Sequence, residues 1–234
     1  MIFNSQGDAK LRQYINGQTI TPGDTAITLP KGAQLLGDVI IEAVDTEKPY
    51  NKELEYIESS GTEYIDTGFK PNQNTRVVMQ FEPTAAYSSI TAFFGVRDVA
   101  SATAPNQFIL WNSGASALRS DYFGTNKTLS ITNLLSRKIV DKNKNTTSVD
   151  GVSVTNTASS GQCSNNMAIF AANSAGTVSL YSRMRLYACR IYDNGVMIRD
   201  YIPVLNKSGV ACLYDKVNKQ FYYNAGSGVF TYAE

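Results

Sequence analysis

The stretch "LYACRIYDNGVMIRDYIPV", residues 186–204, decides the fold class because it predicts a β-hairpin. Runs rich in Tyr, Ile, Val and Arg lie on either side of Asn194 and Gly195, and β-branched and aromatic side chains favour strands. Asn-Gly is a strong hairpin signal, because both central residues of a type I′ turn need a positive φ. The stretch therefore predicts a long antiparallel hairpin, and it leaves open whether the hairpin belongs to an enzyme, a binding module or an assembly.

The chain after residue 54 repeats this pattern of short strands and polar turns. The segment "RVVMQFE" alternates, which puts Val77, Met79 and Phe81 on one face of a strand. Other predicted strands lie at 91–96, 106–112, 166–173 and 178–192, in two parts of 136–156 turned at Asp150-Gly151, and in two parts of 210–232. The best helix candidate is only a turn near Thr132–Leu135. Roughly ten to fourteen strands indicate an all-β chain with two packed antiparallel sheets.

Composition supports a β-rich protein and excludes several classes of function. Of the 234 residues, 43% are hydrophobic and 18% are charged, whereas roughly 25% charged is typical of globular chains. The net charge of +1 argues against nucleic-acid binding. The sequence has no histidine, the most common general base and metal ligand. We find no apolar run of about 18 residues and no secretory signal at the start.

The cysteines Cys163, Cys189 and Cys212 are odd in number and widely spaced. This spacing fits neither a disulfide framework nor a zinc site, so we predict reduced, mostly buried thiols in a protein synthesised in a reducing cytoplasm. Cys163 lies in the polar segment "SSGQCSNN", which predicts that this thiol is the exposed one.

The first 45 residues are predicted to form a separate small β module. Strand candidates at Gln18–Thr21, Ala26–Leu29 and Asp38–Val44 are separated by turn residues. A module this small buries little surface alone, so we expect it to attach to another protein or to sister copies. The expected contact residues are Ile20, Ile27, Leu29, Val39 and Ile41. Residues 46–53 are interpreted as a linker and 54–234 as the second domain.

Two regions carry a resemblance to known families. The segments "ELEYIESSGTEYIDTGFKPNQNTRVVMQFE" (53–82) and "RLYACRIYDNGVMIRDYIPVLNKSGVACLYDKVNKQFYYNAGSGVF" (185–230) resemble concanavalin A-like, laminin-G-type jelly rolls of tailed-phage virion proteins and gut-bacterial surface proteins. Residues 16–45 resemble a short repeat of phage appendage proteins. The resemblance implies a two-sheet jelly-roll sandwich. It implies less about function, since this fold includes lectins, glycanases and adhesion modules.

A glycanase on this fold uses paired carboxylates on one strand. The nearest candidates are Glu53, Glu55 and Glu58, with Asp66 further along, and their order does not match the E-x-D-x-x-E pattern of such enzymes. Solvent-facing residues at the start of a strand are the simpler interpretation. We therefore predict no catalytic residue and no enzymatic activity.

Glycan binding and calcium binding are the remaining small-ligand expectations. An aromatic platform beside planar amides makes Trp111, Asn112 and Tyr122 the candidate glycan-binding residues, although the apolar run around Trp111 favours burial. Arg183 and Arg185 share a strand face and fit either an anionic ligand or an exposed sheet surface. Calcium is the usual ion of laminin-G-type domains. We predict no tight metal site and no cofactor, since Asp150-Gly151 is more simply a turn, and leave weak calcium binding open.

These observations favour a non-enzymatic phage virion protein, either a capsid decoration or head fibre or a tail appendage, on the exterior of the particle. Its N-terminal module is expected to bind capsid or tail proteins. Its jelly roll is expected to display a surface for host or mucosal glycans in a homo-oligomer, with avidity from many copies. A bacterial surface carbohydrate-binding adhesin is the alternative, and a glycan hydrolase is the disfavoured third interpretation.

Overall fold

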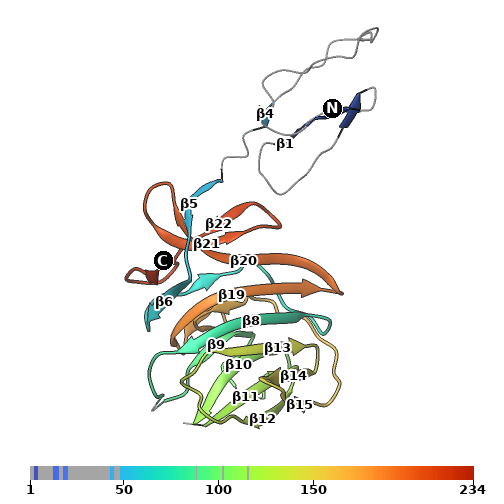
Figure 1. Cartoon of the computed structure of the whole chain (residues 1–234). Helices are drawn as coiled ribbons and strands as arrows, with labels where there is room; N and C mark the ends of the chain where they lie inside the picture. The colour runs from blue at the N-terminus through green and yellow to red at the C-terminus, as the bar shows by residue number, and fades with distance from the viewer. Residues whose placement is uncertain are drawn as a thin grey trace. The chain divides into compact units, whose positions relative to one another are not determined.

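The computed structural model describes residues 48–87, 89–101, 103–114 and 116–234, together with the backbone of 3–4, 13–15, 18–20 and 43–44 (Figure 1). The chain divides into two compact units, Met1–Pro49 and Tyr50–Glu234.

In the first unit, two pairs of short strands are described. Strand β1 (Phe3–Asn4) pairs in parallel with β4 (Ala43–Val44), and β2 (Gln13–Ile15) pairs in antiparallel with β3 (Gln18–Ile20). The predicted strand at 18–21 thus corresponds to β3, and the end of the predicted strand at 38–44 corresponds to β4. The predicted strand at 26–29 lies outside the described residues. The same is true of four expected attachment residues, Ile27, Leu29, Val39 and Ile41, whereas the backbone of Ile20 belongs to β3.

The second unit is an antiparallel two-sheet sandwich, which confirms the predicted all-β jelly-roll class. The larger sheet of the described residues has eleven strands, with the order β15-β14-β13-β8-β19-β20-β21-β22 along its main path. Its strands are β5 (Tyr50–Glu53), β6 (Tyr56–Ser60), β8 (Arg76–Pro83), β13 (Lys138–Asn143), β14 (Thr146–Val149), β15 (Val152–Thr155), β19 (Arg183–Asp193), β20 (Val196–Asn206), β21 (Ala211–Asp215), β22 (Gln220–Tyr222) and β23 (Thr231–Ala233). Strands β5, β6 and β23 lie off the path and pair with β20, with β19, and with β6 respectively.

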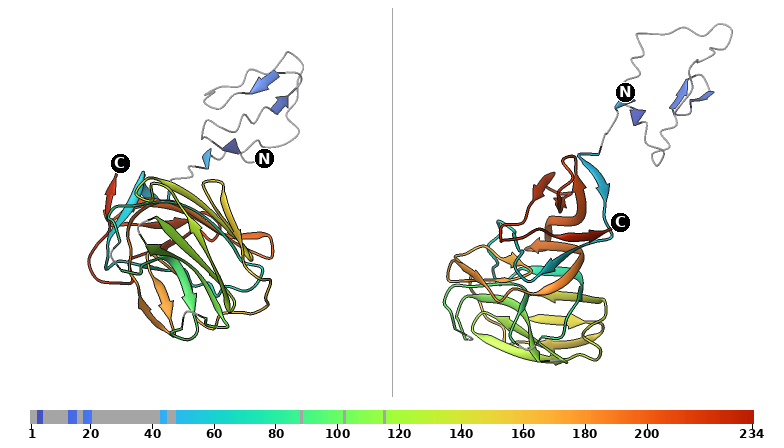
Figure 2. Two further views of the ribbon diagram at one scale, coloured as in Figure 1. Left: turned by 90° about the horizontal axis from the view of Figure 1, so that it is seen from below. Right: turned by 90° about the vertical axis from the view of Figure 1, so that its left-hand side faces the viewer.

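The smaller sheet of the described residues has eight strands, with the order β12-β11-β10-β9-β16-β7 along its main path. They are β7 (Ile65–Asp66), β9 (Ala92–Arg97), β10 (Gln107–Gly114), β11 (Ala117–Tyr122), β12 (Thr125–Ser130), β16 (Ala168–Ile169), β17 (Ala172–Ser174) and β18 (Thr177–Ser179). Strand β17 is the exception to antiparallel pairing here, since it runs parallel to β9. Figure 2 gives two further views of the sandwich.

The core lies between the two sheets and follows the predicted alternation. Val77, Met79 and Phe81 of β8 are fully buried, and Phe93 and Phe108 face them from the smaller sheet. The rings of Phe81 and Phe93 lie with their centroids 4.7 Å apart. Because side chains alternate along a strand, Val78 and Gln80 face away from the core, and the same rule defines an outer face for each sheet.

The hairpin predicted at residues 186–204 is confirmed. Strands β19 and β20 pair in antiparallel, and Asp193 lies opposite Val196 across the turn. Asn194 and Gly195 have φ values of 49° and 83°, as a type I′ turn requires. The hairpin is central in the larger sheet, with β8 beside one arm and β21 beside the other.

Three other predictions differ from the structure. The long strand predicted at 178–192 begins only at Arg183, because Leu180 has a φ of 59° and its carbonyl accepts a hydrogen bond from Ala92 N at 2.7 Å. The buried run at 166–173 is divided into β16 and β17 by Phe170, whose φ is 72°. The predicted linker at 46–53 is wrong in its second half, since Tyr50–Glu53 form β5 and pair with β20.

The three cysteines are buried and free, as the sequence predicts. The expected exposure of Cys163 is wrong, because its side chain is 1% exposed in the core cluster. Burial raises the pKa of the Cys163 thiol well above its usual range, so the thiol is a poor nucleophile. The described residues contain no helix, and so none that is long and apolar enough to cross a membrane; Thr132–Leu135 lies between strands as bends and turns.

Candidate ligand-binding surface

The outer face of the larger sheet carries aligned rows of polar side chains. Strand register places Glu58 of β6 beside Arg185 of β19, and Arg185 beside Glu82 of β8. The next rows across β19, β8 and β13 are Ala188–Gln80–Ile139, Arg190–Val78–Asp141 and Tyr192–Arg76–Asn143. Because neighbours in one row share a face, these side chains form one continuous surface.

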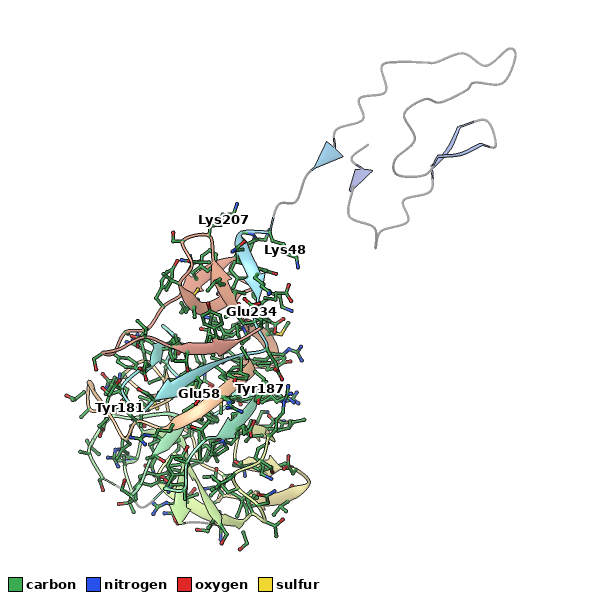
Figure 3. The ribbon with its side chains drawn as sticks, turned by 60° about the vertical axis from the view of Figure 1, so that its left-hand side comes forward. Lys48, Glu58, Tyr181, Tyr187, Lys207 and Glu234 are labelled. Carbon is green, nitrogen blue, oxygen red and sulfur yellow. The ribbon has the colours of Figure 1, made fainter. Side chains whose placement is uncertain are left out.

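Most charges on this face are paired in register. Arg185 Nε donates to Glu58 Oε2 at 2.8 Å, and its Nη1 lies 3.8 Å from Glu82 Oε2. The hydrogen bond with Glu58 is the main reason that the pKa of Arg185 is raised. The hydroxyl of Tyr187 donates to Glu82 at 2.6 Å, and burial followed by this bond raises the pKa of Tyr187 to about 12. Figure 3 labels Glu58 and Tyr187 on this part of the sheet.

The pairing continues along β19. Arg190 Nε donates to Asp200 at 3.0 Å, and Lys216 lies 3.0 Å from the other oxygen of the same carboxylate. Arg76 forms a two-point ion pair with Asp141, at 2.9 and 2.7 Å. Such partly exposed pairs each contribute about 0–1 kcal/mol, so they define the shape of the surface more than its stability.

A polar pocket of about 310 Å³ lies at one end of this face. We call it the hairpin pocket; it is lined by Asn74, Arg76, Asn143, Lys144, Tyr192, Asn194 and Gly195. Three turns supply four of these residues: the loop before β8, the β13–β14 turn and the β19–β20 turn. Arg76, Asn143 and Tyr192 belong to the adjoining ends of β8, β13 and β19. A volume near 300 Å³ is at the lower end of small-molecule sites.

Hydrogen bonds between the turns hold the hairpin pocket in shape. Asn74 Nδ2 donates to Asn194 Oδ1 at 2.8 Å, and Asn72 Nδ2 donates to Asp193 Oδ1 at 2.7 Å. The backbone N–H of Lys144 donates to the carbonyl of Thr75 at 2.9 Å. The loop before β8 is thus bonded to both other turns, which makes the pocket preorganised.

The hairpin pocket offers the chemical groups that bind hydroxyl-rich ligands. Tyr192 is half-buried, with the guanidinium carbon of Arg76 5.2 Å from its ring centroid. The side chains of Asn143 and Lys144 form no hydrogen bond or ion pair with another described residue. An amide and an ammonium are therefore available to a ligand beside an aromatic ring, a combination suited to sugar hydroxyls.

The structure does not bring the three predicted glycan-binding residues together. Trp111 is 4% exposed on the outer face of the smaller sheet, whereas Tyr122 points into the core, opposite Phe108. The side chain of Asn112 also lies on the opposite face of the sheet from that of Trp111. Its Oδ1 accepts a hydrogen bond from the Thr91 hydroxyl at 2.9 Å. The apolar run around Trp111 favoured burial, and burial is what the structure shows.

The candidate carboxylates are also dispersed. Glu58 is bonded to Arg185, Glu53 accepts from the Tyr50 hydroxyl at 2.6 Å, and Glu55 lies 3.9 Å from Arg137. Asp66 belongs to β7 in the other sheet. Asp150 has a φ of 48° in a turn, as predicted, and lies 3.1 Å from Lys138. Among the described residues, no group of three or more metal-ligating acidic, histidine or cysteine side chains occurs.

Sequence reasoning missed the hairpin pocket, although one of its signals was visible. The sequence predicts the turn at Asn194-Gly195, and it contains asparagines near residues 72–74 and 143–145. Their convergence depends on β8 lying between β13 and β19, which is a pairing of strands far apart in the chain.

Comparisons with known proteins give fold-level similarity. No family model and no curated protein matches the sequence. The CBM40 of the Ruminococcus gnavus IT-sialidase is similar in structure, with a TM-score of 0.45 and 12% identity over 60% of this chain and 91% of that chain. A NanB structure with Optactamide gives 0.39 and 10% identity, over 72% of this chain and 38% of that one. A mutant of the NanB sialidase from Streptococcus pneumoniae gives 0.37 and 10% identity, over 76% and 40%.

Proposed function

We propose that residues 50–234 form a non-catalytic glycan-binding domain whose ligand occupies the hairpin pocket. The observation that carries this proposal is the preorganised pocket of about 310 Å³, in which amide groups converge beside the half-buried ring of Tyr192. Sugars present hydroxyl groups around an apolar ring face, and amides with an adjacent aromatic ring complement both features.

The charges of the pocket favour a ligand that is neutral or carries little charge. Arg76 is neutralised by its two-point pair with Asp141, and the remaining lining cation, Lys144, is exposed, so water screens its charge. Each single site of this size is expected to bind weakly, and many copies on one particle would supply avidity.

The absence of catalysis is part of the proposal. Glycoside hydrolysis needs two carboxyl groups on either side of the scissile bond, about 5–10 Å apart, one of which donates a proton. On this face Glu58 and Glu82 both contact one guanidinium, that of Arg185, which favours the ionised form of both carboxyl groups over a proton donor. The jelly roll therefore presents a surface for recognition.

The proposed setting is the exterior of a tailed-phage virion, as a capsid decoration, head fibre or tail appendage. Its support is the resemblance of segments 53–82 and 185–230 to virion jelly rolls, and of residues 16–45 to an appendage repeat. In this proposal the first unit attaches the protein to capsid or tail proteins in several copies. A bacterial surface adhesin is the alternative, and its glycan-binding chemistry would be the same.

The experiment is a screen of the labelled protein on a glycan array, followed by titration of the strongest ligand. Asn74→Ala and Tyr192→Ala should each weaken binding by about fivefold or more, because each removes a pocket contact of about 1 kcal/mol or more. Gln80→Ala, on the same face and outside the pocket, is the matched control. If folded variants with both pocket substitutions bind as tightly as the parent, the pocket is not the site. Turnover of any glycan would contradict the non-catalytic assignment.

A further inference from the structure

A second cluster of chemically distinctive residues lies on the outer face of the smaller sheet. Trp111 of β10 pairs in register with Arg119 of β11, so their side chains share this face. The guanidinium carbon of Arg119 lies 4.9 Å from the Trp111 ring centroid. That of Arg97, from β9 on the other side of β10, lies 5.9 Å from the same ring. We call Arg97, Trp111, Arg119 and Asp121 the Trp111 site.

Small side chains make room for this arrangement. Trp111 packs into a satellite cluster with Ala92, Ile109 and Ala172, with Leu180 against it. At Gly95 an added Cβ would lie 2.7 Å from Ile109 Cγ2, so only glycine lets Ile109 fill the sheet surface there. The ring of Trp111 is thereby buried in the outer face of the smaller sheet, and two guanidinium groups lie over this closely packed apolar cluster.

The cations of the Trp111 site outnumber its carboxylates. Arg119 Nε donates to Asp121 at 2.7 Å, and the Asp121 side chain is fully buried. Arg97 forms no ion pair with a described residue, and its Nε donates to the neutral hydroxyl of Ser174 at 2.8 Å. Burial lowers the pKa of Arg97 and nearby Arg119 lowers it further, while Asp121 raises it, yet a guanidinium remains charged in proteins. One positive charge is therefore not balanced within the cluster.

Two buried polar atoms in the site, Trp111 Nε1 and Asp121 Oδ2, form no hydrogen bond of normal geometry with a described residue, but they lie close enough to each other for the indole N–H to lower the pKa of Asp121. The indole N–H is therefore directed at Asp121, and the donors left for an anionic ligand are those of the guanidinium groups. The half-buried guanidinium of Arg97 adds the four N–H donors of its two terminal nitrogens, since its Nε is used by Ser174.

We propose that the Trp111 site binds the carboxylate group of an acidic ligand, held between Arg97 and Arg119. The planar fork of a guanidinium matches a carboxylate at two points, and the unbalanced charge of Arg97 attracts a single anion. Asp121 restricts the site to one negative charge, because a dianion would be repelled by the buried carboxylate. The ligand class is a small carboxylate, either free or carried on an acidic sugar. This proposal does not depend on ligand binding in the hairpin pocket.

The test uses Trp111, the only tryptophan of the chain, as a local fluorescent reporter. Sodium glucuronate is titrated into the full-length protein at constant ionic strength, with glucose as the neutral sugar, acetate as the free carboxylate and sulfate as a dianion. Glucuronate should give a saturable change in emission, and glucose should give none. Saturation by acetate as well assigns the site to a free carboxylate, and saturation by glucuronate alone assigns it to an acidic sugar.

Arg97→Gln should weaken glucuronate binding by about tenfold or more, and Arg97→Lys should weaken it less, because lysine keeps the charge and loses the fork. Arg190→Gln, which removes an exposed arginine from the other sheet, should leave the titration unchanged. If Arg97→Gln unfolds, Ser174→Ala removes the anchor of Arg97 and should weaken binding in the same direction.

Three outcomes would overturn the proposal: no saturable change with any carboxylate, an equal response to glucose, or tighter binding of sulfate than of glucuronate. Tyr192→Ala should leave the fluorescence titration intact. This variant separates failure of the Trp111 site from failure of the hairpin pocket.

Discussion

The outer faces of the two sheets use arginine in opposite ways. On the larger sheet, Arg185 and Arg190 each lie directly opposite a carboxylate of the next strand, and Arg76 pairs diagonally with Asp141. On the smaller sheet, Arg97 lies beside a serine hydroxyl, and Arg119 has the buried Asp121. Residue type alone does not determine what such a face recognises; the cross-strand neighbour decides whether the charge is neutralised.

The aromatic residues of the two faces differ in the same way. Tyr192 is half-buried at the edge of a polar pocket, whereas Trp111 is 4% exposed beneath guanidinium groups. A ring at a pocket edge can contact a sugar directly. A sunken ring instead fixes the cations above it, which is why we assign a hydroxyl-rich ligand to one face and a carboxylate to the other.

The largest expected effect concerns a charge that lies between the two faces. Lys142 is fully buried, its Nζ donates to Ser120 Oγ at 2.6 Å, and it lies 4.6 Å from the Phe108 ring centroid. Burial lowers the pKa of Lys142 to about 7, partly offset by Asp121 on the smaller sheet. Because the unfolded chain binds this proton up to its ordinary pKa of 10.5, the free energy of unfolding should rise between pH 7 and 10.5.

Lys142→Met should therefore raise the free energy of unfolding at pH 6 to about 7 by a few kcal/mol, since one pKa unit corresponds to about 1.4 kcal/mol. It should also remove most of the increase in the free energy of unfolding between pH 7 and 10.5. Urea unfolding across this pH range is the measurement. Lys127→Met, on an exposed position of edge strand β12, is the control and should change neither value. An unaltered pH slope in Lys142→Met would mean that another group carries the titration.

The next largest effect compares one substitution on the two faces. Gly95→Ala would place Cβ 2.8 Å from the backbone Cα of Ile109, so β9 and β10 must move apart, at a cost of about 3 kcal/mol. Gly195→Ala meets nothing within 4 Å and costs only the strain of a φ of 83°, about 1 kcal/mol. Chemical denaturation measures both. Equal losses would contradict the close packing that we describe under the Trp111 site.

The hairpin and the β8 alternation could be predicted because their signals are local. Asn194-Gly195 requires a tight turn, and Val77, Met79 and Phe81 share a face through the pleat of one strand. The breaks at Phe170 and Leu180 could not be predicted in this way, since nothing in their local sequence signals a positive φ. Phe170 separates two strands of the smaller sheet, and Leu180 lies where the chain passes from β18 to β19 of the larger sheet. Neither site was predictable as a whole, because Arg97, Trp111 and Arg119 meet only through the register of three strands.

A smaller effect should distinguish paired from unpaired arginines. Arg185→Gln leaves Glu58 and Glu82 without their shared cation, and the partly exposed pair should lose at most about 1 kcal/mol, less in high salt. Arg97→Gln removes a half-buried charge that has no described carboxylate partner, so stability should stay level or rise slightly. Thermal unfolding at low and high salt tests this difference in sign. If both variants lose stability to the same extent, the arginines of the two faces are paired alike, which contradicts the comparison.

The smallest expected effect comes from removing the first unit. Among the described residues, every strand pair formed by Tyr50–Glu234 is internal to that unit. A chain that begins at residue 50 should therefore unfold with the same free energy as the sandwich of the full chain, within about 0.5 kcal/mol. Neither face should lose ligand, because both sites lie within 50–234. In the virion proposal the same truncation should abolish loading onto particles, measured by co-sedimentation.

A chain that begins at Leu54 is the matched comparison, because it also loses β5. The ring of Tyr50 lies 5.3 Å from that of Tyr214, and Tyr50 packs with Val204 and Cys212 in a satellite cluster beside the larger sheet. Removing this strand should expose the cluster and cost about 2 kcal/mol, from the lost burial of one aromatic side chain. If the chains starting at 50 and 54 unfold alike, β5 adds nothing to the sandwich and the domain begins after it. If both shortened chains are unstable, the first unit stabilises the second. The binding experiments on the two faces then require the full-length chain.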